Sequence, residues 1–135
     1  MSALQKFAWF NLSVIALTLV AVVLLLPVLG KGALGGFGFL GLLGFGPLFL
    51  RRKAGQVLID ERDLAIQRRS WAVASALFWV VFVLAASLLS PFVYGEDGAV
   101  PVAIVQGSVF LGLMILYVVM SIAILVQYAG GTVNA

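Results

Sequence analysis

The chain has 135 residues, of which 64% are hydrophobic and 10% are charged, and its formal net charge at pH 7 is +3. Soluble domains carry about 25% charged residues, so this chain cannot cover a surface that faces water on all sides. The sequence has no cysteine and no histidine, which excludes disulfides, thiol redox pairs and imidazole ligands for haem or zinc. We therefore expect an integral membrane protein that is not an enzyme, with no cofactor, no metal and no nucleic-acid partner.

Four stretches of the chain contain no Asp, Glu, Lys or Arg, and each supplies the roughly 20 apolar residues that cross a bilayer. They predict an all-α membrane protein, a four-transmembrane-helix bundle formed by a single domain, residues 1–135. The expected spans are about residues 6–29, 33–50, 70–94 and 101–127, with a loop at 51–69.

Positive charge is concentrated between the second and third expected spans, where six of the eight Lys and Arg residues lie. Short loops rich in Lys and Arg stay on the cytoplasmic side. An even number of spans then places both termini in the cytoplasm. We expect a multi-pass protein of the plasma or inner membrane of the cell, in contact with membrane lipid.

The first expected span is apolar over 23 residues after Lys6, which is longer than the 7 to 15 residues of a signal-peptide core. We therefore expect it to remain in the protein. It contains Asn11, for which we expect a hydrogen bond to another helix. Contact between Asn11 and a substrate is the alternative.

The second expected span is rich in glycine, with seven glycines from Gly32 to Gly46 and five of them at every third position. A helix without side chains on one surface lets another backbone approach closely in lipid. On an α-helix, a step of three residues drifts by about 60° and winds the glycines around the axis. We expect close packing against the first or third span or a second subunit, and the alternative is an unwound helix that lines a transport path. The expected packing residues are Gly32, Gly35, Gly36, Gly38, Gly41 and Gly44.

The third expected span follows a charged segment, Asp60 to Arg69. Asp60 suits a helix N-cap, and acidic residues in the first turn complement the helix dipole. Because nothing from Glu61 to Ser90 breaks a helix, we expect one rod whose first turns project into the cytoplasm. Ile59, Asp63, Ile66 and Ser70 share one face of it. The candidate partner-binding residues are Asp60, Glu61, Arg62, Asp63, Arg68 and Arg69.

The phrase Asp60-Glu61-Arg62-Asp63, followed by Ile66 and Arg69 and then by a hydrophobic span, resembles the motif of an uncharacterised family of small predicted integral membrane proteins in bacteria and archaea. The resemblance implies paired spans on either side of a cytoplasmic Asp-Glu-Arg segment. It implies no known activity.

Two functions are open on this evidence. The first is an interaction, accessory or assembly subunit, which docks through the glycine surface in the membrane and through the charged helix outside it, as a homo-oligomer or in a larger membrane complex. The alternative is a transporter or channel for a small or lipid-like solute that works as an oligomer, because four thin helices enclose little space.

Overall fold

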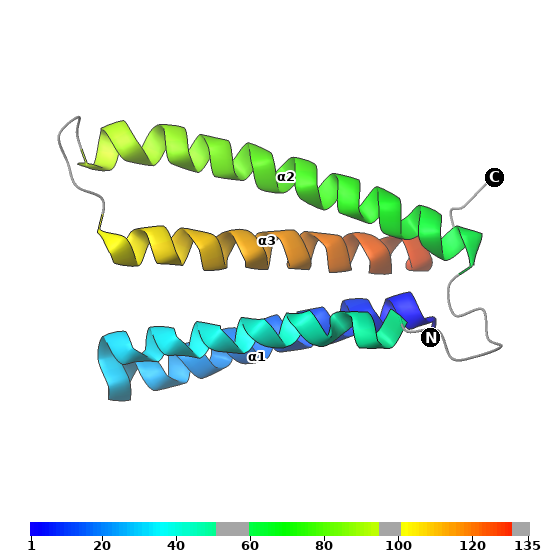
Figure 1. The fold of residues 1–135 in the computed structure, drawn as a ribbon, viewed down its shortest axis with the longest axis horizontal. Helices are drawn as coiled ribbons and strands as arrows, with labels where there is room; N and C mark the ends of the chain where they lie inside the picture. The colour runs from blue at the N-terminus through cyan, green and yellow to red at the C-terminus, as the bar shows by residue number, and fades with distance from the viewer. Residues whose placement is uncertain (51–59, 95–100, 131–135) are drawn as a thin grey trace.

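The computed structural model describes residues 1–50, 60–94 and 101–130. These residues form the helices α1 (Ala3–Leu29), α2 (Glu61–Tyr94) and α3 (Val102–Ala129), and a 3-10 helix, η1 (Gly30–Leu50). All four elements run along the long axis of the molecule, and each runs opposite to the one before it (Figure 1). The start of α1, the end of η1, the start of α2 and the end of α3 share one end of the molecule, which we call the terminal end.

The first two elements form a hairpin that reverses at Gly30. Helix α1 begins with a capping box, in which the Ser2 hydroxyl accepts a hydrogen bond from the Gln5 backbone N–H at 3.1 Å and the Gln5 side chain accepts one from the Ser2 N–H at 2.8 Å. At the other end, Gly30 has a φ of 52°, the one positive φ among the described residues. Residues with a Cβ rarely adopt this conformation. Glycine at this position therefore allows η1 to return along α1.

Element η1 is a 3-10 helix of 21 residues, so the expected α-helix with glycines winding around its axis is wrong. A 3-10 helix has 3.0 residues per turn, and side chains at positions i and i+3 eclipse one another. Glycine at every third position removes this crowding along one row. The row is straight and consists of Gly32, Gly35, Gly38, Gly41 and Gly44.

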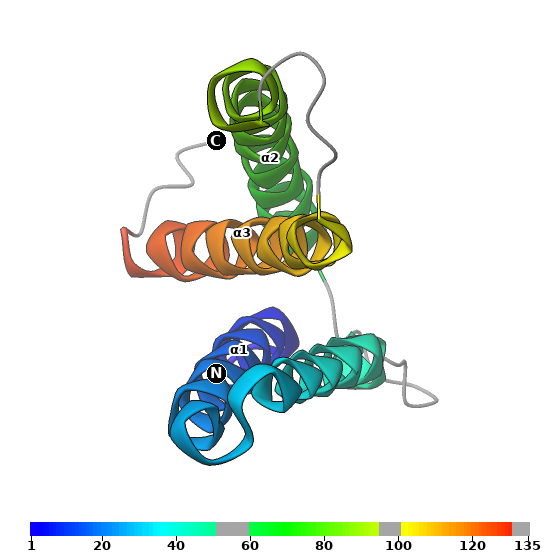
Figure 2. The ribbon, with the colours of Figure 1, turned by 90° about the vertical axis from the view of Figure 1, so that its left-hand side faces the viewer.

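The other two elements are single α-helices. Helix α2 is one rod of 34 residues, as the sequence predicts. Helix α3 begins directly after Pro101, whose missing N–H is no loss at a helix start. Viewed from the end, α3 lies between α2 on one side and the α1–η1 hairpin on the other (Figure 2).

The buried core has two clusters along α3. The cluster nearer the terminal end joins α1, α2 and α3, and its members are Leu4, Phe7, Ala8, Ile66, Ala74, Met120 and Ile124. The second cluster joins α1 and η1 and consists of Val14, Ile15, Leu40 and Leu43, with α3 side chains packed on it. Beside it, the rings of Phe37 and Phe110 stack with their centroids 5.3 Å apart.

Three segments of the described residues are long and apolar enough to cross a membrane: Ala3–Gly46, Glu61–Ser87 and Ile104–Ala129. This result confirms an all-helical membrane protein for the described chain, but it does not support the expected count of four spanning helices. The count differs because α1 and η1 follow one another without a break and make one segment of 44 residues. The basic cluster at residues 51–53 and the acidic residues 96 and 97 lie outside the described residues.

Candidate functional site

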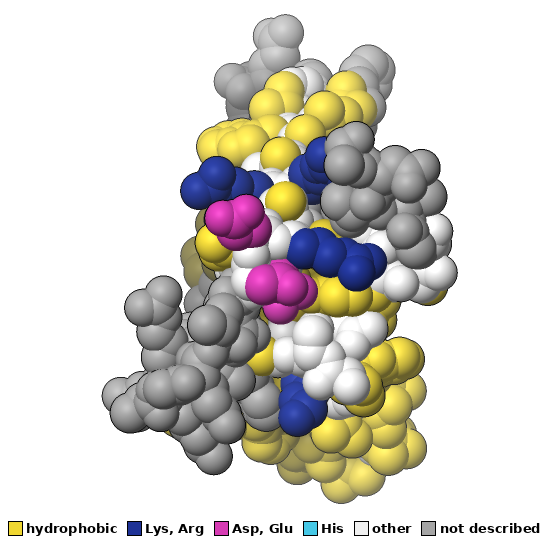
Figure 3. Space-filling model, turned by 90° about the vertical axis from the view of Figure 1, so that its right-hand side faces the viewer, with side chains coloured by type: hydrophobic (Ala, Val, Ile, Leu, Met, Phe, Trp, Pro, Cys, Tyr) yellow, Lys and Arg dark blue, Asp and Glu magenta, His cyan; other side chains and the backbone are white. Residues whose placement is uncertain are grey.

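Charged side chains gather on the terminal end, which Figure 3 views directly. The carboxylate of Asp60 accepts a hydrogen bond from the backbone N–H of Asp63 at 2.7 Å. Asp60 is therefore the N-cap that the sequence predicts for α2. One carboxylate oxygen of Asp60 therefore stabilises the start of α2.

Asp63 belongs to the interior of the molecule. Its exposed fraction is 7%, and Asp63 Oδ1 accepts a hydrogen bond from the Tyr128 hydroxyl near the end of α3. The Arg62 guanidinium carbon lies 6.0 Å from the centroid of the same tyrosine ring, within the range of a cation–π contact. These contacts fasten the start of α2 to the end of α3, and we call Arg62, Asp63 and Tyr128 the tyrosine clamp.

The candidate partner-binding residues thus separate into two groups. Asp63 is buried, Asp60 caps its helix and Arg62 lies over Tyr128. Glu61, Arg68 and Arg69 are exposed to solvent. Asp63, Ile66 and Ser70, which the sequence predicts to share one face of α2, are all buried, with Ile66 1% exposed and Ser70 fully buried. Ile59, the fourth residue of the predicted face, lies outside the described residues. The Ser70 hydroxyl accepts a hydrogen bond from Gln127 Nε2 at 2.8 Å.

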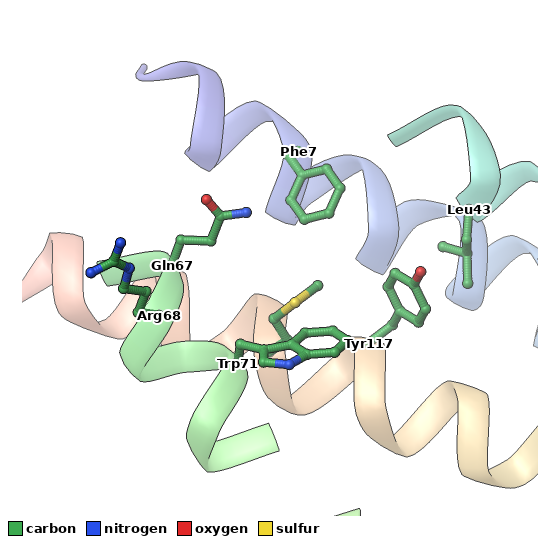
Figure 4. A pocket seen from close by; sticks show the side chains of 7 residues that line it. Phe7, Leu43, Gln67, Arg68, Trp71 and Tyr117 are labelled. Atoms are coloured by element: carbon green, nitrogen blue, oxygen red, sulfur yellow. The ribbon is translucent and has the colours of Figure 1, made fainter. Parts of the chain in front are cut away.

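Arg68 stands at the mouth of a cavity of about 370 Å³ that all four elements line. We call it the terminal cavity. Figure 4 shows Gln67 and Trp71 of α2 on one side of the opening and Phe7 of α1 and Leu43 of η1 on the other, with the guanidinium of Arg68 extending outward at the edge. Tyr117 and Met120 of α3 complete the lining. The cavity is polar and cationic at one side and apolar over the rest.

Sequence reasoning missed every member of this cavity except Arg68. The one local signal is the spacing of Arg68 and Trp71, which places a cation and an amphipathic ring on one side of α2. Phe7, Leu43 and Met120 come from three other elements. These residues are brought together by packing between helices that are far apart in the sequence, and the hydrophobic periodicity of a single helix does not predict such packing.

Asn11 is the most deeply buried polar group of α1, with no exposed surface. Its Nδ2 lies 3.4 Å from the hydroxyl oxygen of Ser121 on α3, so the expected interhelical hydrogen bond is present. Asn11 Oδ1 has no hydrogen-bond partner among the described residues. The pair joins α1 to α3 beside the terminal cavity, because Met120, the residue before Ser121, lines that cavity.

The glycines of η1 face two ways. A Cβ placed on Gly36 meets Val22 Cγ2 at 2.9 Å, and one on Gly46 meets Phe7 Cε2 at 2.5 Å. These two glycines let η1 lie close against α1. By contrast, a Cβ on the open glycine row meets no atom of the described chain within 4 Å, and this row consists of Gly35, Gly38, Gly41 and Gly44. Gly32 lies at its start, where the added Cβ meets Leu29 Cβ at 3.7 Å.

Comparison with known families gives a match over residues 5–127, to the family described as "Predicted membrane protein (DUF2178)". The chain belongs to this family. The match takes in most or all of each helical element and the whole segment from Asp60 to Arg69. It confirms the expected membership of an uncharacterised membrane protein family. No curated protein and no solved structure matches the chain.

The description of DUF2178 places its members in the membrane and names no activity. Family membership therefore supports membrane localisation of this chain. The role of the terminal cavity, the tyrosine clamp and the open glycine row has to be argued from their geometry.

Proposed function

We propose that this DUF2178 protein crosses the plasma or inner membrane four times, with both termini in the cytoplasm. The reversal at Gly30 supports four crossings, because it divides Ala3–Gly46 into two antiparallel rods. At about 1.5 Å per residue α1 is about 40 Å long, and at about 2.0 Å per residue η1 is about 42 Å long. Each exceeds the roughly 30 Å of the hydrocarbon core. The six cations at residues 51–69 favour a cytoplasmic terminal end.

Single cysteines test this topology, because the chain has none of its own. Gly55→Cys and Asp97→Cys place one thiol on each side of the membrane. A membrane-impermeant thiol reagent added outside intact cells should label position 97 and leave position 55 unlabelled until the cells are lysed. Labelling of position 55 alone in intact cells would show that the orientation is the opposite of the one proposed.

Within the membrane, we infer that the protein is an interaction subunit that docks through the open glycine row on a second copy of the chain. The observation that carries this proposal is the open space beyond Gly35, Gly38, Gly41 and Gly44, in the same helix whose Gly36 and Gly46 lie close against α1. At Gly35 and Gly38 this space is a cavity that α3 also lines. Large apolar side chains flank the row, since Phe39, Leu42 and Phe45 are between 43% and 54% exposed. Such a row allows close backbone approach, and large flanking side chains can interlock.

The second copy is favoured over other partners by symmetry. Two copies inserted in the same orientation are related by a twofold axis along the membrane normal, so the same patch of each faces the other. A straight row on a 3-10 helix stays in contact with its twin along its length. On an α-helix the same row would drift by about 60° at each step and would face its twin again only after about six steps.

Two differently tagged copies, expressed together and extracted in mild detergent, test the docking. Gly41→Leu in both copies should sharply lower co-purification, because the side chain blocks backbone approach. Ala76→Leu is the matched control, since Ala76 is an exposed small residue of α2 that does not line the cavity beside the row. Unchanged co-purification for Gly41→Leu, or equal loss for both variants, contradicts docking through the row.

The exposed charges of α2 form a second proposed contact, with a soluble or membrane partner outside the bilayer. Glu61 and Arg69 are exposed and lie outside the terminal cavity and the tyrosine clamp. Complementary charge on a partner controls specificity and association rate more than affinity. Reversing both, by Glu61→Arg with Arg69→Glu, should remove such a partner from native co-purification and leave expression unchanged.

A transporter for a small or lipid-like solute is the second candidate. One observation favours it: a second cavity of about 530 Å³, lined by η1 and α3 near Gly35 and Gln106, lies toward the opposite end from the terminal cavity. The apolar cluster around Leu40 separates the two. If they are two halves of a route, Leu40→Ala should raise solute flux into liposomes. Equal flux for this variant and protein-free liposomes contradicts transport.

A further inference from the structure

We propose that the terminal cavity binds an anionic phospholipid, with its phosphate at Arg68 and the upper part of an acyl chain inside. This inference does not rest on self-association, because the open glycine row and the terminal cavity involve different surfaces of η1. Leu43 faces the cavity and is 4% exposed, whereas a Cβ on Gly41 or Gly44 meets open space.

The lining is polar at the mouth and apolar at the floor, which matches the polar headgroup and apolar chain of a lipid. Phe7, Leu43 and Met120 are between 4% and 8% exposed and make an apolar floor. Arg68 is exposed and Gln67 is half-buried at the mouth. Only hydrogen-bond donors can satisfy phosphate oxygens, and a guanidinium offers two parallel N–H groups to them. The amide of Gln67 can add another donor.

The depth of the mouth fits the phosphate level of the bilayer. Arg68 and Arg69 are the last charged residues of α2 before a stretch of apolar sequence, and Lys6 is the last in α1 before Phe7. The hydrocarbon therefore begins at this level. Trp71 is 50% exposed one turn further along α2, and tryptophan favours the interface between headgroups and hydrocarbon.

Charge selects an anionic lipid over a zwitterionic one. The cations nearest this level are Lys6, Arg68 and Arg69, all exposed. The nearest carboxylate before Arg68 on α2 is Asp63, which already accepts the hydrogen bond from Tyr128. The volume of about 370 Å³ is near the lower end of the range for small-molecule sites. It admits part of one lipid, whose remaining chain lies against the apolar outer surface.

Quenching of Trp71 by brominated lipid tests the proposal. The substitutions Trp9→Phe and Trp79→Phe leave Trp71 as the sole tryptophan. In phosphatidylcholine vesicles, phosphatidylglycerol with brominated chains should quench Trp71 at a lower mole fraction than brominated phosphatidylcholine does. Arg68→Gln should raise the mole fraction needed by at least about tenfold, because it loses hydrogen bonds between charged groups in addition to surface attraction.

Arg69→Gln is the matched control, because it removes the same charge one residue away without touching the cavity. It should raise that mole fraction by no more than about fivefold, because a cation outside the site contributes only general surface attraction. Leu43→Phe should weaken quenching by filling the floor with no change in charge. Soluble glycerol phosphate should not compete.

Three results would overturn the proposal. Equal effects of Arg68→Gln and Arg69→Gln indicate surface charge alone. Equal quenching by the two brominated lipids indicates no headgroup recognition. Relief of quenching by glycerol phosphate indicates a phosphate site that does not require the lipid chain.

Discussion

The inward and outward glycines of η1 have the same side chain but face different surroundings. Gly36 and Gly46 are buried against Val22 and Phe7 of α1, whereas Gly35, Gly38, Gly41 and Gly44 face open space. On α3, Gly112 resembles the inward set, because an added Cβ would lie 2.8 Å from Phe78 Cε2. Glycine content alone therefore does not identify an interface. Inward glycines set the spacing within one chain, and the outward glycines are those on which we propose that a second copy docks.

The largest expected difference in stability is between leucine substitutions at two adjacent glycines, Gly35 and Gly36. Gly36→Leu should lower the free energy of unfolding by about 1–3 kcal/mol, because the new side chain overpacks the contact with Val22. Gly35→Leu should leave the stability of the single chain unchanged, since nothing lies opposite it within 4 Å. Unfolding in detergent micelles, with each variant held below its association concentration, measures both. Equal losses would remove the distinction between the two sets.

The turn at Gly30 determines which glycines of η1 face α1. Gly30→Ala should lower stability by about 1–2 kcal/mol, because a Cβ is strained at a positive φ. Gly38→Ala is the control, as Gly38 has an ordinary φ and open space around it. We expect no loss of stability for Gly38→Ala in the same assay. If Gly30→Ala unfolds like the parent, the reversal at this residue is wrong.

A smaller effect is expected at the tyrosine clamp, where α2 meets α3 through polar groups in place of glycine contacts. Tyr128→Phe should lower stability by about 1 kcal/mol, because it removes the hydrogen bond to the buried Asp63. Tyr117→Phe is the matched control, since the structure gives Tyr117 no hydrogen bond to a described residue. The difference between the two variants in the same unfolding assay measures the clamp. No difference would show that Asp63 has another partner.

Features set by local sequence could be predicted before the structure. The absence of a helix breaker from Glu61 to Ser90 predicts the long rod of α2, and the place of Asp60 before an acidic first turn predicts the N-cap. The spacing of Asp63, Ile66 and Ser70 predicts that they share one face of α2, and the structure adds that this face is buried. In each case the signal lies within a few turns of one helix.

Features set by distant contacts could not be predicted. The pairing of Asp63 with Tyr128 joins residues 65 positions apart, and the terminal cavity joins four elements. The helix type of η1 was missed for a different reason. A repeat of three residues winds around an α-helix and forms a straight row only on a 3-10 helix, and long 3-10 helices are too uncommon for the repeat alone to predict one.

The most direct test of the account is a scan of single cysteines from Leu34 to Phe45, oxidised in native membranes. The account predicts that cross-linking between two copies peaks at positions 35, 38, 41 and 44, with minima at the inward positions 36, 40 and 43. A period of 3.0 residues supports both the 3-10 helix and docking through the open glycine row. Peaks at the 3.6-residue spacing of an α-helix, or no cross-linked dimer at any position, would contradict it.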